Sequence, residues 1–246
     1  MAARDLVFEA EDRVRTWGQF VVGPDGDWLD LARVHDLISK PPGWKSDRSI
    51  RLIGADAEAV PTDFGPNRVP GFVSVVGTWR DERIEVEAQS PQIPAREPSA
   101  DWTDPPCPRP PGGWRRDALA WDLDYGDLES SGAMVTRVIF RPSAGQEVLV
   151  VAATDLDAVT RQLSPHLPDQ LCVVPSLFTR AQLDEVYDVL LARWREWRLE
   201  SFGTGADAQA QPFITAELFR VTAEMAEWAE MQPEGLVRLR PALSPA

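Results

Sequence analysis

Apolar positions in the first ninety residues follow the two-residue period of β-strands. Short runs rich in β-branched and aromatic residues stand between Gly, Pro and Asp, at 15–22, 49–53, 71–79 and 84–88. In the third run Val73, Val75 and Gly77 form one face of an alternating strand, and residues 80–83 return the chain into the fourth run. This pattern predicts a hairpin within a mostly-β N-terminal part.

The predicted hairpin, Gly71-Phe-Val-Ser-Val-Val-Gly-Thr-Trp followed by Ile84-Glu-Val, resembles the central hairpin of small Greek-key barrels of the OB type. The resemblance implies a barrel-like domain, and such barrels bind oligonucleotides or sugars along one sheet face. The tryptophans of this part are candidates for a base-stacking platform, although core packing is favoured because acids outnumber basic residues here. They are Trp17, Trp28, Trp44 and Trp79, and Trp79 is kept as a candidate binding residue.

A proline-rich stretch separates the chain into two parts. Eight prolines occur between positions 91 and 111, and proline neither donates to a sheet ladder nor fits a helix interior. Residues 91–116 are therefore predicted to be a linker or strap. The predicted domains on either side are a barrel-like 1–90 and an α+β 117–246.

After the strap, strands alternate with helices. Strands are predicted at 134–140, 147–153, 171–174, 213–221 and 236–239, and a surface loop at 203–211. Thr154 and Thr179 are predicted N-caps of helices that end at about 165 and about 200, and a third helix spans 222–231. In the second helix, the apolar positions that predict one buried face are Leu183, Val186, Tyr187, Leu190, Leu191, Trp194 and Trp197.

Two segments of the C-terminal part, 147–175 and 215–241, share the order strand, Thr cap, short helix, Pro-x-x-Leu, strand, Pro. We interpret them as related βαβ units joined by the long helix, in a split arrangement similar to ferredoxin-like folds. Each unit would expose an apolar sheet face that the long helix and the other unit can cover. The predicted class is α+β: a small OB-like barrel, then a ferredoxin-like part with repeated βαβ units.

Composition and charge narrow the class of protein and its partners. The 246 residues are 43% apolar and 26% charged, as in soluble globular proteins, and the longest apolar run, 148–153, is too short to cross a bilayer. The acidic N-terminal residues do not form a signal peptide, so a cytoplasmic location is expected. With 25 basic and 39 acidic residues the net charge is −14, which disfavours nucleic acid as a partner.

Two cysteines, Cys107 and Cys172, lie far apart without the spacing of a zinc site, which leaves reduced thiols or one disulfide as alternatives. The element Cys107-Pro-Arg-Pro-Pro-Gly-Gly-Trp114, with Leu171-Cys-Val-Val and a Thr-x-x-Gln-Leu helix, resembles a group of uncharacterised actinobacterial proteins. Members of that group are often exported, whereas this sequence shows no leader. The resemblance implies a disulfide between the two cysteines and carries no function.

Side chains typical of catalysis are scarce. The two histidines, His35 and His166, belong to no nucleophile-elbow, His-x-x-x-His or Cys–His pattern. Because lysine occurs only at Lys40 and Lys45, a phosphate-binding loop with its lysine is also missing. We therefore predict no cofactor, no metal and no catalytic residue.

Acidic residues gather at two places that are candidate binding surfaces. The first is an acidic segment with an apolar face, whose alternating oxygen ligands resemble a calcium loop but fail the EF-hand spacing. The second is the last predicted helix, where an acidic row is either a solvated face or a field that attracts a basic partner. The residues singled out are Trp121, Asp122, Asp124 and Asp127 in the first place, and Glu224 and Glu227 in the second.

These observations predict binding without chemistry. The sequence is rich in packing and capping signals and poor in proton-transferring groups, so we expect a non-catalytic protein that binds an unidentified, basic protein partner through an acidic surface. The alternative is a hydrolase of unknown substrate that uses carboxylates or one of the histidines. A third class, nucleic-acid binding, requires a basic groove across Arg51, Arg68, Arg80 and Arg83.

Overall fold

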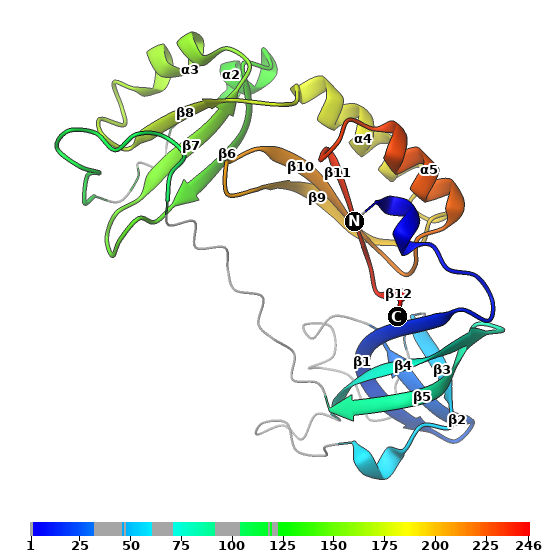
Figure 1. The fold of residues 1–246 in the computed structure, drawn as a ribbon. Coiled ribbons are helices and arrows are strands. Elements are labelled where there is room, and N and C mark those ends of the chain that lie inside the picture. Colours follow the sequence, from blue (N-terminus) through cyan, green and yellow to red (C-terminus); the bar gives the residue numbers. More distant parts are fainter. Residues whose placement is uncertain are drawn as a thin grey trace.

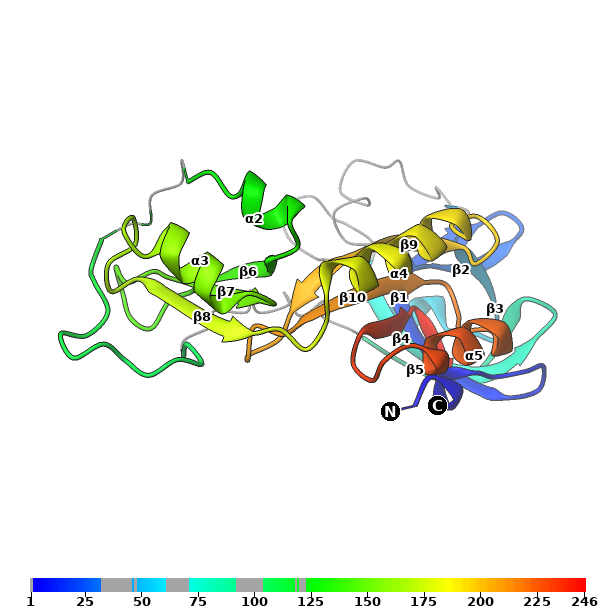
Figure 2. The same cartoon turned by 90° about the horizontal axis from the view of Figure 1, so that it is seen from above.

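The computed structural model describes residues 2–31, 46, 48–60, 71–91, 104–117, 119 and 123–246. This part of the chain is α+β with strands predominating, arranged in one ring-like sheet and two three-stranded sheets (Figure 1). Seen from above, one three-stranded sheet lies at one end of the molecule, and the other lies over the ring-like sheet (Figure 2).

The N-terminal strands close into a barrel. They are β1 (Arg13–Gly23), β2 (Gly26–Asp30), β3 (Ser49–Ile53), β4 (Phe72–Arg80) and β5 (Arg83–Pro91). The strand order is β1-β2-β3-β5-β4, and the long β1 closes the ring because its first part pairs with β4 and its last part with β2. All neighbours are antiparallel except β3 and β5, which are parallel.

Two glycines allow the barrel strands to approach closely. A Cβ on Gly77 would lie 2.2 Å from the Glu85 carbonyl oxygen, and one on Gly18 would lie 2.4 Å from the Asp30 carbonyl oxygen. Any larger residue would push the strands apart at these positions. The inward face is filled by alternating apolar side chains such as Val73 and Val75, both fully buried.

The predicted hairpin is confirmed as β4–β5, and the strands predicted at 15–22 and 49–53 are also present. The hairpin turn consists of Asp81 and Glu82, which both adopt positive φ (49° and 57°) although neither is glycine or asparagine. Strand β2 was not predicted, because its short acidic sequence lacks the β-branched run that identifies strands. Its last residue, Asp30, is buried and accepts a 2.7 Å hydrogen bond from the Ser46 hydroxyl.

The C-terminal part repeats one order of elements twice. The first set is α2 (Gly126–Ser130), β6 (Met134–Phe140), β7 (Val148–Ala153), α3 (Leu156–Leu163) and β8 (Leu171–Pro175). The second set is α4 (Arg180–Ala192), β9 (Leu199–Ala206), β10 (Pro212–Leu218), α5 (Ala223–Met231) and β11 (Val237–Pro241). In each set two antiparallel strands are followed by a helix and by a third strand, which pairs in parallel with the second strand. The two predicted βαβ units are therefore present.

The predicted split arrangement of these units is wrong. Strands β7 and β8 are direct neighbours, as are β10 and β11, whereas a split unit would hold another strand between them. The reason is that the third strand of each sheet is the one that precedes the βαβ unit, β6 or β9. It pairs with the free edge of the central strand, β7 or β10, and does not insert between the two parallel strands.

Two local predictions in this part are also corrected. Helix α4 ends at Ala192 and not near 200. The first part of the predicted loop, 203–206, belongs to strand β9, whereas 207–211 form the turn that leads to β10. The apolar spacing continued to Trp197 because the turn after the helix keeps helix-like bonds, such as Trp197 N to Arg193 O at 2.9 Å. The α3 cap is Asp155, whose side chain accepts from Ala158 N, whereas Thr154 donates to the Gly132 carbonyl.

The sheet β6–β8 is covered on both faces. Helices α2 and α3 pack on one face through Leu128, Val159 and Leu163. The other face contacts the described part of the proline-rich stretch, residues 104–117, which we call the strap. Trp114 of the strap and Ala210, from the turn between β9 and β10, complete this second apolar cluster. The strap thus has a packing role.

Both ends of the chain cross between the two predicted domains. The N-terminal turn η1 (Ala3–Leu6) packs on the core of the second unit, and Arg4 forms a 2.7 Å ion pair with Glu230 of α5. The C-terminal strand β12 (Leu243–Pro245) pairs with β1 of the barrel. The predicted boundaries remain predictions, but the barrel and the second unit share these exchanged segments. In the described ranges, no helix is both long and apolar enough to span a bilayer.

Candidate functional site

Helix α4 lies on the outside of the molecule (Figures 1 and 2). It carries more apolar residues than the β9–β11 sheet covers. It begins at a capping box in which Thr179 accepts from Gln182 N at 3.2 Å, as the sequence predicts. Leu183, Val186 and Leu190 are buried against the β9–β11 sheet. The predicted single buried face is therefore only half correct, because other apolar residues of the helix face solvent.

Three large apolar side chains along α4 and the turn after it are exposed. Tyr187 is 42%, Leu191 58% and Trp194 37% exposed, and their spacing of four and three residues places them in one line on the helix. Tyr187 and Trp194 contact the same ring, Phe202 of β9, with ring centroids 4.7 and 5.4 Å apart. We call these four residues the α4 surface. The sequence analysis missed this surface. The signal was that the helix carries two rows of apolar residues, more than one sheet face can cover.

Charged side chains border the α4 surface. Arg180 forms a 3.0 Å ion pair with Asp184 in the first turn of the helix. The side chains of Glu185, Asp188 and Arg195 are exposed and make no hydrogen bond or ion pair with any residue that the structure describes. The surface is thus acidic beside the helix and basic beyond its end.

Arg193 is engaged on its own side of the helix end. It donates to both carboxylate oxygens of Glu196, at 2.6 and 2.7 Å, and lies 3.5 Å from Glu224 of α5. The hydrogen bond with Glu196 raises the pKa of Arg193, so its guanidinium stays charged. Arg193 therefore ties α5 to the end of α4. Arg195, two residues further on, is an exposed cation whose side chain has no partner among the described residues.

A hollow of about 570 Å³ lies between α2 and the first turn of α4. Its lining includes Glu129 and Ser130 of α2, and Arg180 and Asp184 of α4. Glu129 is paired with Arg137, and Arg180 with Asp184, so the charges at its wall neutralise one another. None of its lining residues is a histidine.

The predicted acidic segment is only partly described, since Trp121 and Asp122 lie outside the described residues. Asp124 accepts a 2.9 Å hydrogen bond from Gly126 N, and Asp127 belongs to the first turn of α2. The Asp124 carboxylate therefore serves the turn that begins a short helix. Across the described ranges, no group of three or more His, Cys, Asp or Glu side chains could hold a metal ion.

Tyr125, at the start of this helix, lies under a cation. The Arg137 guanidinium stands 4.3 Å from the centre of its ring. Burial raises the pKa of Tyr125, while the positive charge of Arg137 opposes that shift. The tyrosine is thus a neutral packing residue at physiological pH.

Trp79 is a core residue and not a surface platform. It is 4% exposed and makes edge contacts with Phe8 and Phe219, at 5.9 and 6.3 Å between ring centroids. This position joins the barrel to the second unit. A ligand could reach little of its indole ring.

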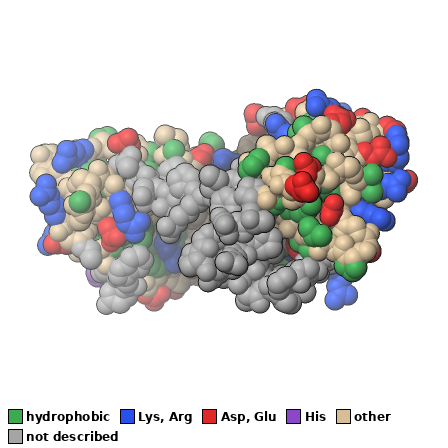
Figure 3. Space-filling model, turned by 90° about the horizontal axis from the view of Figure 1, so that it is seen from below, with side chains coloured by type: hydrophobic (Ala, Val, Ile, Leu, Met, Phe, Trp, Pro, Cys, Tyr) green, Lys and Arg blue, Asp and Glu red, His purple; other side chains and the backbone are tan. Residues whose placement is uncertain are grey.

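The acidic row on α5 is partly neutralised by arginines from other elements. Glu224 lies 3.5 Å from Arg193, and Glu230 forms a 2.7 Å ion pair with Arg4. Glu227 lies in the same row with no ion pair to any described residue. On the face shown in Figure 3, acidic and basic side chains are likewise interspersed over both ends of the molecule. The predicted acidic field is therefore weak at α5.

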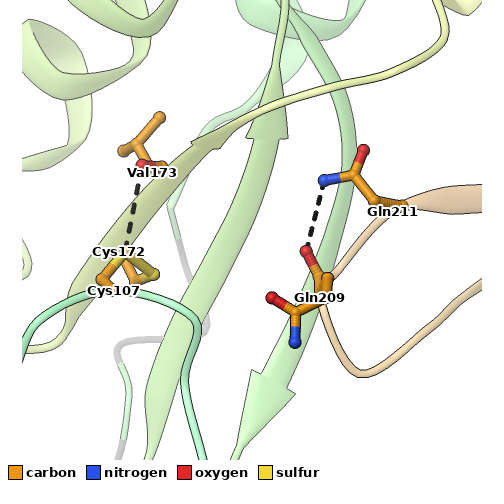
Figure 4. The surroundings of a disulfide bond; sticks show 5 residues. All are labelled: Cys107, Cys172, Val173, Gln209 and Gln211. Carbon is orange, nitrogen blue, oxygen red and sulfur yellow. Dashed lines mark hydrogen bonds between the residues drawn. A yellow bond between two sulfur atoms is a disulfide. The ribbon is translucent and has the colours of Figure 1, made fainter.

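The two cysteines form a disulfide that fixes the strap to the β6–β8 sheet (Figure 4). Cys107 of the strap is bonded to Cys172 of β8, with Cα atoms 5.7 Å apart. Gln211, from the turn between β9 and β10, donates to the Pro175 carbonyl at 3.1 Å and accepts from Leu177 N at 2.8 Å. Strap and turn thus hold the two units together on one side of the sheet.

The hydrolase alternative depends on the two histidines, and nucleic-acid binding depends on a row of arginines. His166 is exposed after α3, and His35 lies outside the described residues, so the hydrolase alternative stays a prediction. Arg51, Arg83 and Arg80 occupy facing positions on β3, β5 and β4. Arg80 binds Glu11 and Glu85, and Arg83 binds Asp81, so this row carries little net charge. Arg68 is not among the described residues.

Comparison with known proteins adds no relative. No protein-family model, curated protein or solved structure gives a significant match to this chain.

Proposed function

We propose that this protein is a non-catalytic binding protein and that it binds a protein partner through the α4 surface. The observation that carries the proposal is the line of Tyr187, Leu191 and Trp194, each more than a third exposed, on a well-capped helix. Large apolar side chains that gather on one exposed face are typical of protein interfaces, where aromatic residues supply most of the binding energy.

The charges beside this surface favour a partner that presents cations at the contact. Glu185 and Asp188 leave two carboxylates beside the apolar line without a cation to neutralise them among the described residues. A partner that offers apolar side chains next to arginine or lysine would complement this site.

For the scaffold, we propose that the barrel is of the OB type. The closed order β1-β2-β3-β5-β4, the parallel β3–β5 pair and the long β1 shared by two neighbours support this assignment. In the C-terminal part, the likeness to ferredoxin-like folds extends to two repeated α/β units with helices on a sheet face, and not to the strand order.

The disulfide bears on the location of the protein. The sequence favours the cytoplasm, but a structural disulfide persists in an oxidising compartment and is rare in a reducing one. We infer that the chain folds where Cys107 and Cys172 stay oxidised. Trapping of free thiols in intact native cells tests this inference, and two free thiols in the mature protein would contradict it.

The binding function is tested by photo-crosslinking in native cells. A benzophenone amino acid replaces Leu191 in one variant and Leu156 of α3 in a matched control, because both leucines are exposed on helices of different units. We expect a crosslinked protein adduct from position 191 and none from position 156. No adduct at position 191, or the same adducts from both positions, would contradict the proposal.

A further inference from the structure

The charges along α4 and the turn after it point to a partner that carries opposite charges at matching positions. We infer that the α4 surface binds the α4 surface of a second copy of this chain, with the two helices antiparallel about a two-fold axis. The inference rests on the proposed binding function, for which it names the partner. Two-fold dimers use the same patch on both subunits, so the patch must complement itself.

The α4 surface meets this requirement in its charges. The unpaired acid Asp188 lies three residues before Leu191, and the accessible cation Arg195 lies four residues after it. A two-fold axis beside Leu191 therefore brings Asp188 of one copy opposite Arg195 of the other, and the same pair forms again across the axis. Asp188 lies about 5 Å before Leu191 along the axis of α4, and Arg195 follows Leu191 in the turn after the helix, which keeps helix-like hydrogen bonds.

Antiparallel pairing is the orientation that these charges select. A parallel pair would place Asp188 against Asp188 and Arg195 against Arg195, and like charges facing each other destabilise an interface. In the antiparallel pair Leu191 meets Leu191 at the axis, and Tyr187 of one copy approaches the Trp194 end of the other. The apolar line is thus covered along its whole length.

The size of the patch predicts a dimer of moderate strength. The exposed parts of Tyr187, Leu191 and Trp194 provide roughly 300 Å² of apolar surface per copy. A stable interface buries about 1,200–2,000 Å² in total, so flanking polar residues must supply the remainder. We expect a dissociation constant on the order of micromolar, and a monomer–dimer equilibrium that depends on concentration.

The inference is tested by sedimentation equilibrium of the full chain from roughly 1 to 100 µM. Asp188→Arg and Arg195→Asp each convert two attractive contacts into repulsive ones, and we expect each variant to dimerise about tenfold more weakly than the native chain. An equimolar mixture of the two variants restores both attractive contacts, so it should form mixed dimers as tightly as the native chain. Both positions are exposed, and circular dichroism checks that the variants remain folded.

Each outcome decides between the two proposals. A native chain that stays monomeric throughout this range overturns the second-copy partner, and so do variants that dimerise like the native chain or a mixture that is not rescued. If the native chain is monomeric while position 191 crosslinks a different protein, the binding function stands and only the partner is wrong. A monomer with no crosslink at position 191 removes both.

Discussion

Reduction of the Cys107–Cys172 disulfide is the perturbation with the largest predicted effect on stability. The bond holds the strap on a sheet face where Cys172, Val148 and Val150 are almost fully buried. In the folded state, the strap keeps its apolar contacts when the bond is broken. In the unfolded state, the chain between the two cysteines is no longer linked into a loop and gains conformational freedom. Reduction therefore lowers the free energy of unfolding chiefly by raising the entropy of the unfolded chain.

The magnitude follows from the number of residues that the bond encloses. The two cysteines are separated by 65 positions. For a loop of this size the chain-entropy relation gives a stabilisation of about 4 kcal/mol at 25 °C. Globular proteins are stable by only about 5–15 kcal/mol in total, so the reduced protein should unfold at a much lower urea concentration.

Urea unfolding measured by tryptophan fluorescence provides the assay, since Trp114 of the strap is buried beside the disulfide. The oxidised chain is compared with the same chain after treatment with a phosphine reductant. A Cys107→Ala/Cys172→Ala double variant is the control, because its transition must not respond to the reductant. A loss smaller than about 1 kcal/mol on reduction would refute the argument, since the enclosed loop would then not constrain the unfolded chain.

Three further predictions concern the barrel. Gly77→Ala should lower the free energy of unfolding by about 2 kcal/mol or more in urea titrations, because the new Cβ overlaps the Glu85 carbonyl oxygen. Glu82→Gly should raise the melting temperature, because the positive φ costs a non-glycine residue about 1 kcal/mol and glycine adopts it without this strain. Hydrogen bonds from Arg80 lower the pKa of Glu11 below 4.5, so this carboxylate stabilises the fold above that pH and loses its effect as pH falls. As the pH falls below the ordinary pKa of a glutamate, the native chain should therefore lose more stability than Glu11→Gln.

Each of these predictions has an outcome that contradicts it. An unchanged urea midpoint for Gly77→Ala would mean that the strands separate at no cost. A lower melting temperature for Glu82→Gly would mean that the flexibility of glycine outweighs the relieved turn. Parallel acid profiles of the native chain and Glu11→Gln would mean that the Arg80 contact is absent in solution.

Most of the local structure could be predicted from the amino-acid sequence, because local structure depends on neighbours along the chain. Alternation of apolar residues located the β4–β5 hairpin, and the capping box at Thr179 located the start of α4. The shared pattern of two segments also revealed the two βαβ units, since each βαβ unit is one continuous stretch of chain. These features need no knowledge of what packs against them.

Tertiary contacts alone decided which apolar residues remain exposed. Periodicity places Tyr187, Leu191 and Trp194 on one side of α4 and the turn after it, but only the position of the β9–β11 sheet leaves them in solvent while Leu190 is buried. The same holds for the barrel, whose closure requires β1 to pair with strands distant in sequence, and for β12, which returns from the chain end. Pairings between remote segments depend on the whole packed structure, and no local pattern encodes them.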